Sequence, residues 1–88
     1  MKFEIKKSFL KDLKKLNDKR LAEEVKNLFD IIEKAENLQE IPNVKKLKGF
    51  EEFYRIRIGK YRVGIRYNNN EVTFIRILPR KDIYKFFP

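Results

Sequence analysis

Residues 54–67 read YRIRIGKYRVGIRY, and apolar and charged side chains alternate on both sides of Gly59 and Lys60. A period of two is typical of a β-strand that buries one of its faces. Glycine readily adopts the positive φ that a tight hairpin turn needs. We therefore expect two antiparallel strands joined at Gly59–Lys60. One face would be aliphatic and aromatic, and the other would carry four arginines, namely Arg55, Arg57, Arg62 and Arg66.

Two further strands are expected outside this hairpin. Asn68–Asn70 provide a second turn, because asparagine tolerates left-handed backbone geometry. Residues 71–80, EVTFIRILPR, then form the last strand, with Ile75 and Ile77 expected to face the helices and Arg76 and Arg80 the opposite side. Residues 2–6, KFEIK, alternate in the same way and predict a first strand.

The segment between these strands predicts two helices. Ser8 is a candidate N-cap, and Asn17–Asp18 offer a break and a second cap. Apolar residues at helical spacing follow each cap, and the second helix is expected over about residues 19–36. The apolar positions are Phe9, Leu13 and Leu16, then Leu21, Val25, Leu28, Ile32 and Ala35, with Phe29 beside them.

Residues 37–52, NLQEIPNVKKLKGFEE, contain Pro42 and Gly49 and show no sustained periodicity. We expect them to form a connection held in place by Ile41, Val44 and Leu47. The predicted fold is a single α+β domain spanning residues 1–88. Its antiparallel sheet has one N-terminal and three C-terminal strands and packs on two N-terminal helices.

Composition excludes several classes of chemistry. The chain has 88 residues, of which 42% are hydrophobic, and this argues for one globular domain rather than disorder. It has neither cysteine nor histidine, so disulfides, thiolate metal sites and the commonest catalytic base are missing. We expect no bound metal and no cofactor. No apolar segment is long enough for the core of a signal peptide or for a membrane span, so the expected location is the cytoplasm.

The positive charge is concentrated in the second part of the chain. The net charge is +9; residues 1–53 hold 13 Lys and Arg against 11 Asp and Glu, while residues 54–88 hold 9 against 2. All arginines except Arg20 lie after Tyr54. Arginine presents a planar fork that matches two phosphate oxygens at once. The alternative is that these arginines simply form a basic face exposed to solvent. Only two acidic residues, Glu71 and Asp82, lie in this part of the chain, and they are too few to neutralise the arginines. We therefore expect an anionic partner.

Three stretches together resemble the RelE/ParE toxin superfamily, and most closely its RelE-like branch. They are KKLKGFEEFYRIRIGKYRVGIRY (residues 45–67), FIRILPRKDIYKFFP (residues 74–88) and the strand and helix pair before them, so the likeness covers nearly the whole chain. The resemblance implies an antiparallel sheet backed by two N-terminal helices. It also implies a type II toxin that a co-encoded, RelB-like antitoxin holds inactive, and an mRNA endonuclease that cleaves in the ribosomal A site.

The resemblance also implies a set of functional residues. The catalytic candidates are Arg57, Arg62, Arg80 and Tyr84, and the candidates that hold the RNA backbone are Arg55, Arg66, Arg76 and Lys81. Two positions depart from the family pattern: the enteric enzyme has lysines on the first hairpin strand, and near relatives have histidine where this chain has Pro79. Because arginine is a poor base at neutral pH, proton transfer falls to Tyr84, Lys81 or a ribosomal group.

The hypothesis that follows is attack of a 2′-hydroxyl on the adjacent phosphodiester without a metal ion. The product ends would be a 2′,3′-cyclic phosphate and a 5′-hydroxyl, and the arginines would stabilise the charge of the transition state. Two alternatives stay open. One is a ParE-like protein that inhibits DNA gyrase by binding, and the other is a nucleic-acid or ribosome-binding module without catalysis.

Overall fold

The hairpin predicted at Gly59–Lys60 forms the centre of the sheet. In the computed structural model, which describes residues 1–88, β3 (Phe53–Ile58) pairs antiparallel with β4 (Tyr61–Asn68), and Ile58 lies opposite Tyr61. Gly59 has a φ of 55°, as the turn requires. Asn69 and Asn70 are also left-handed and lead into β5 (Glu71–Pro79), the second neighbour of β4. These parts of the prediction are confirmed.

The sheet has five strands in the order β1-β5-β4-β3-β2, one strand more than expected. The first strand, β1 (Lys2–Ile5), lies beside β5 and runs parallel to it, so the sheet is mostly rather than wholly antiparallel. The extra strand is β2 (Val44–Lys46), which pairs with β3 from within the segment expected to be a connection. The short 3₁₀ turn η1 (Leu38–Glu40) precedes it.

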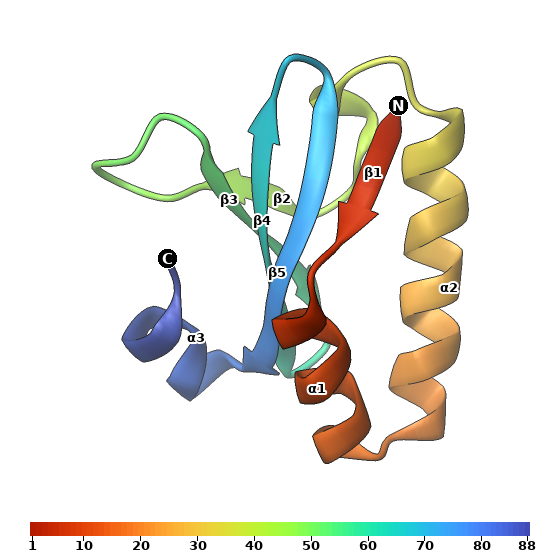
Figure 1. The fold of residues 1–88 in the computed structure, drawn as a ribbon, viewed down its shortest axis with the longest axis vertical. Helices are drawn as coiled ribbons and strands as arrows, with labels where there is room; N and C mark the ends of the chain where they lie inside the picture. Colours follow the sequence, from red (N-terminus) through yellow and green to blue (C-terminus); the bar gives the residue numbers. More distant parts are fainter.

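Helices α1 (Lys7–Leu16) and α2 (Lys19–Lys34) cover one face of the sheet, while α3 (Arg80–Phe86), which was not expected, lies on the other (Figure 1). Asp18 caps α2 as predicted, because its carboxylate accepts the Leu21 N–H at 3.1 Å. The prediction that Ser8 caps α1 is wrong. Ser8 lies inside the helix, and its hydroxyl donates to the Ile75 carbonyl of β5.

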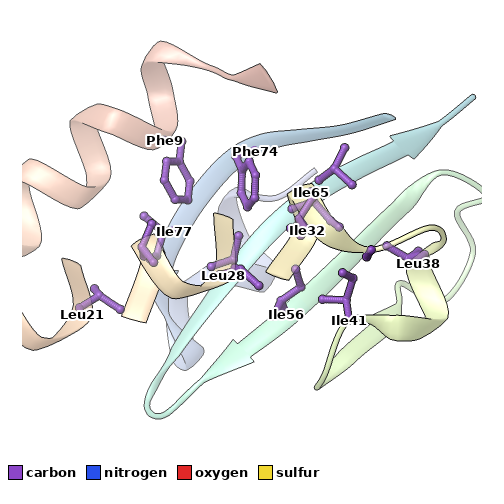
Figure 2. Packing of buried hydrophobic residues seen from close by; sticks show 14 residues of the cluster. Phe9, Leu21, Leu28, Ile32, Leu38, Ile41, Ile56, Ile65, Phe74 and Ile77 are labelled. Carbon is purple, nitrogen blue, oxygen red and sulfur yellow. The ribbon is translucent and has the colours of Figure 1, made fainter. Parts of the chain in front are cut away.

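A buried apolar cluster fills the space between the sheet and the two N-terminal helices (Figure 2). Phe74 of β5 belongs to it, with the rings of Phe3, Phe9 and Phe29 5.6, 5.4 and 5.0 Å from its own. Other fully buried members come from the predicted stripe of α2, from the hairpin and from β5, and they include Leu21, Val25, Ile32, Ile56, Val63, Ile65, Val72 and Ile77. The expected apolar face of the sheet and its helical cover are therefore confirmed.

The opposite face of the sheet is not uniformly basic. A second cluster of Leu47, Ile83 and Phe87 holds α3 against it, together with the partly buried Phe53, Ile75 and Leu78. Gly64 of β4 makes this contact possible, since a Cβ there would lie 2.7 Å from the Phe87 ring. The arginines that line the hollow described below lie on the part of this face that α3 does not cover.

Ile75 was expected to face the helices with Ile77, and this is wrong for Ile75. The register of β4 and β5 shifts at Gly64/Ile65, where Gly64 pairs with Arg76 but Ile65 pairs with Phe74. Ile75 is thus the extra residue of a β-bulge and packs in the second cluster, whereas Ile77 is buried in the first. No helix combines the length and the apolar composition needed to cross a membrane.

Candidate functional site

An open hollow of about 490 Å³ lies on the sheet face beside α3. Four arginines line it, and the lining contains no carboxylate. Its residues come from the segment around β2, from the hairpin and from α3: Asn43, Val44, Lys45, Arg55, Arg57, Arg62, Arg80 and Tyr84. All four predicted catalytic residues and one predicted RNA-binding residue, Arg55, are therefore brought together here.

Strand register places the arginines side by side. Arg57 of β3 lies directly opposite Arg62 of β4, and Lys45 of β2 lies opposite Arg55. Like charges at such positions repel each other and cost stability. Arg80 follows β5 at once, with its backbone N–H donating to the Lys60 carbonyl at 2.9 Å. Backbone pairing thus places five cationic residues around one space.

Arg62 is the most unusual of these side chains, because only 8% of its surface is exposed. Its Nη1 donates to the carbonyls of Gly59 and Tyr61, each at 2.9 Å, which fixes the guanidinium against the hairpin turn. Its Nε is buried and has no hydrogen-bond partner. Burial, followed by the charges of Arg55 and Arg80, lowers the pKa of Arg62 below its ordinary value. A bound anion would supply the missing negative charge to this guanidinium group.

Arg57 and Tyr84 differ in how firmly they are held. Arg57 donates through Nη2 to the Asn43 side-chain oxygen, and its backbone N–H donates to the Asn43 carbonyl, both at 3.2 Å. Tyr84 has no such contact, is 57% exposed and lies one helical turn after Arg80. Its phenol is therefore free to meet a ligand in the hollow.

Asn43 and Lys45 line the hollow but were not foreseen. Asn43 has a φ of 62°, a left-handed geometry that asparagine tolerates and that follows Pro42 in the sequence. The sequence Pro42-Asn43 predicts a turn, but it does not predict that this turn lies beside the arginines of the hollow. Lys45 belongs to a strand of three residues, which is too short to show a period.

Three predicted RNA-binding residues lie outside the lining of the hollow. Arg66 forms an ion pair of 3.2 Å with Glu52, and Arg76 one of 2.7 Å with Asp12. The hydrogen bonds that Arg76 donates to the Asp12 carboxylate raise the pKa of Arg76. The expectation that only Glu71 and Asp82 could neutralise this part of the chain is thus wrong for these two arginines. Lys81 is exposed on the first turn of α3.

The arrangement is suited to binding an anion with two or more oxygens, because several guanidinium groups surround a space without acidic side chains. No three Asp, Glu, His or Cys side chains come together anywhere in the chain as a metal site would need. The hollow's donors are guanidinium, ammonium, amide and phenol groups.

Comparison with known proteins gives the family. A model described as the ParE toxin of the type II toxin–antitoxin system parDE matches residues 3–84. The chain belongs to the RelE/ParE family of type II toxins. Toxin RelE3 of Methanocaldococcus jannaschii is similar to this RelE/ParE toxin over the full length of both chains, at 37% identity over 89 residues.

Two solved structures share the RelE/ParE fold described above. A RelB-RelE antitoxin–toxin complex from Methanococcus jannaschii contains a chain with a TM-score of 0.82 and 35% identity, covering 97% of this chain and 99% of the other. The RelBE2 toxin–antitoxin complex from Mycobacterium tuberculosis matches with a TM-score of 0.67 at 23% identity, covering 90% and 96%. The second likeness concerns the fold alone.

Proposed function

We propose that this toxin is a ribosome-dependent mRNA endonuclease that cleaves a message held in the ribosomal A site. The observation that carries the proposal is Arg62, a buried cation with an unpaired Nε, among three further arginines around a hollow without carboxylates. Such a site is unfavourable when empty and favourable when it holds a phosphate. The RelE name of a relative similar over its whole length supports the choice of RNA.

The proposed reaction is an in-line displacement at phosphorus. The 2′-oxygen of a ribose forms a bond to the adjacent phosphorus while the bond from phosphorus to the 5′-oxygen breaks, giving a 2′,3′-cyclic phosphate and a 5′-hydroxyl. Negative charge develops on the non-bridging oxygens. Guanidinium groups of Arg57, Arg62 and Arg80 would stabilise that charge more than the ground state, and hydrogen bonds already hold those of Arg57 and Arg62 in place. Lys45 and Arg55 would hold neighbouring phosphates.

Two protons move in this reaction, and the hollow offers few groups to carry them. The 2′-hydroxyl loses one proton, and the leaving 5′-oxygen gains one. Tyr84 is the hollow's only hydroxyl group, so we assign it to proton transfer, with Lys81 or a ribosomal group as the other participant. Such sparse acid–base equipment fits an enzyme that relies on the ribosome to orient the strand.

We further propose that a co-encoded antitoxin holds the toxin inactive. The solved RelB-RelE complex pairs a similar chain with an antitoxin. An acidic, RelB-like segment would neutralise the arginines of the hollow. Co-expression of the antitoxin should then relieve growth arrest.

Inhibition of DNA gyrase is the second candidate, because the matching family model is described by the ParE toxin. This function needs binding rather than chemistry, and the fold permits both. Accumulated gyrase–DNA breaks without shortened messages would favour it. A third outcome, ribosome binding without a cleavage product, would leave a non-catalytic module.

Replacement of Arg80 tests the cleavage proposal. Arg80→Ala should slow single-turnover cleavage of a message in a programmed ribosome by about 10²–10³-fold, the scale of losing one preorganised donor. Arg80→Lys should restore part of the rate, since it keeps the charge but loses the fork. Arg20→Ala, on the exposed surface of α2, removes the same charge and should change little.

The comparison of these variants has two ways to contradict the assignment. Equal cleavage rates for the wild type and all variants would show that Arg80 has no catalytic role. A weaker affinity with an unchanged rate at saturating toxin would make Arg80 a contact to the RNA backbone only.

A further inference from the structure

Helix α1 carries a stripe of lysines that the hollow does not use. Lys7, Lys11, Lys14 and Lys15 are all exposed, and none forms an ion pair. At about 100° per residue they lie within about 100° of one another around the helix axis. With a rise of 1.5 Å per residue, the stripe is about 12 Å long. We call these four residues the lysine stripe.

Solubility alone does not explain the lysine stripe, as α2 demonstrates. That helix is equally exposed on its outer side but alternates four basic residues with four acidic ones, and Arg20 and Glu24 form an i,i+4 ion pair. The only acidic residue of α1 is Asp12, which is bound to Arg76. Lysines at i,i+3 and i,i+4 repel each other and destabilise a helix.

The helix dipole accounts for only half of the lysine stripe. Lys14 and Lys15 lie in the last turn of α1, where positive charge is favourable. Lys7 is the first residue of the helix, where positive charge is unfavourable, and Lys11 lies between the two ends. Lys7 and Lys11 therefore cost stability in the isolated protein and indicate a polyanionic partner.

The lysine stripe continues toward the hollow. Lys15 lines a groove between α1 and α3 together with Arg76 and Phe86, and Asp12 and Asp82 line the same groove. The exposed surface of α3 adds Lys81 and Lys85, and the same helix contributes Arg80 and Tyr84 to the hollow. Figure 1 shows α1 and α3 on either side of the lower end of β5. One long polyanion could thus contact both surfaces.

We infer that the lysine stripe binds the phosphate backbone of a folded RNA while the hollow holds the single-stranded message. Lysine ammonium groups on flexible stems suit sequence-independent phosphate contacts, whereas the rigid arginines suit the reacting phosphate. This inference rests on the proposed function, because the ribosome would present both kinds of RNA. It assigns affinity to α1 and chemistry to the hollow.

The test compares two double variants that remove the same charge. Lys7→Gln/Lys11→Gln changes the lysine stripe, and Lys26→Gln/Lys34→Gln changes exposed lysines of α2. Glutamine has nearly the helix propensity of lysine, so both variants should fold. Binding to an RNA duplex of about 16 base pairs is measured over a range of salt concentrations. The magnitude of the slope of log affinity against log salt concentration should fall by about two for the α1 variant. It should not change for the control variant.

Cleavage in programmed ribosomes provides the second readout. The α1 variant should need more toxin for half-saturation but reach the wild-type maximal rate. If the wild type cleaves no message, the proposed function is wrong. The duplex-binding measurement would still test whether the lysine stripe binds RNA. Equal salt slopes for duplex binding by both variants would overturn the inference. It would also be overturned if the α1 variant lost affinity only for the antitoxin, because the stripe would then be a protein-docking surface.

Discussion

Arg62 and Arg76 are arginines of neighbouring strands with opposite surroundings. Arg76 donates twice to the Asp12 carboxylate, at 2.7 and 3.1 Å, and this hydrogen bonding raises its pKa. Arg62 donates only to carbonyls and lies near other guanidinium groups, and burial lowers its pKa. The first arginine ties α1 to the sheet, and the second is the one that gains most from an anion.

Crowding of positive charge predicts a conflict between stability and binding at Arg55. Arg55→Gln should raise the free energy of unfolding at low salt by about 0.5 kcal/mol, because it removes repulsion from Lys45 across the strand pair and from Arg62. The same change should weaken RNA binding. Urea denaturation at low and high ionic strength measures the first effect, which salt should screen.

Arg66→Gln is the matched control for Arg55→Gln. It also removes one arginine from the hairpin, but one that is paired with Glu52. No gain in stability is expected from it. If Arg66→Gln stabilises the protein as much as Arg55→Gln, net charge rather than the crowded hollow sets the stability.

The sequence identified the arginines but not which of them have partners. Glu52 lies 14 residues before Arg66, and Asp12 lies 64 residues before Arg76. Counting charges by segment cannot find such pairs, because the fold brings them together. Arg57, Arg62, Arg80 and Tyr84 could be selected in advance because they follow a motif with a fixed order.

At the scale of elements, α3 positions two residues of the hollow. Its first residue is Arg80, and Tyr84 lies on its second turn. The helix is held by Ile83 and Phe87, and the Phe87 ring occupies the space above Gly64 that a side chain would otherwise fill. The position of Arg80 and Tyr84 therefore depends on the missing side chain of Gly64.

Gly64→Ala should displace α3 while the main core stays folded. The new methyl group would lie 2.7 Å from the Phe87 ring, so the ring must move. Overpacking of this kind costs about 1–3 kcal/mol, and a shift of about 1 Å at the hollow can slow the reaction about 10²-fold. Single-turnover cleavage and thermal unfolding measure the two effects.

A second change separates a displaced helix from a damaged sheet. Phe87→Leu makes room for the methyl group, so Gly64→Ala/Phe87→Leu should recover part of the lost cleavage. If the double variant is no faster than Gly64→Ala alone, the defect lies in the sheet rather than in the placement of α3.

Elements with a long period or alternation were predictable, and those without one were not. The hairpin, β1, β5, α1 and α2 each repeat a pattern several times. β2 has three residues, and α3 follows Pro79 directly with seven residues that alternate charged and aromatic side chains irregularly. The bulge at Gly64/Ile65 could not be foreseen either, because an uninterrupted alternation places Ile75 with Ile77.

At the scale of the whole molecule, the sheet separates two apolar clusters of unequal size. Fourteen buried residues lie between the sheet and the two N-terminal helices, whereas three hold α3 on the other face. Stability is not uniform in such a structure, and the element with fewer buried contacts opens first. We therefore expect the main core to stay packed when α3 opens.

Native-state hydrogen exchange should detect this difference. Amides of α3 should exchange through a local opening with a smaller free energy than the amides shared by β4 and β5. Low concentrations of urea should accelerate exchange in the central strands more than in α3, since global unfolding exposes more surface. Identical exchange free energies in α3 and the central strands would mean that the two clusters unfold as one unit.

The parallel pairing of β1 with β5 has a consequence for a chain that is still being made. β1 pairs with a strand that is synthesised about seventy residues later, since Lys2 pairs with Glu71 and Ile5 with Phe74. Arg80 and Tyr84 follow later still. A growing chain therefore carries Arg55, Arg57 and Arg62 without the two residues that complete the hollow. The order of synthesis itself keeps the nascent polypeptide from assembling its site before Arg80 and Tyr84 have been made.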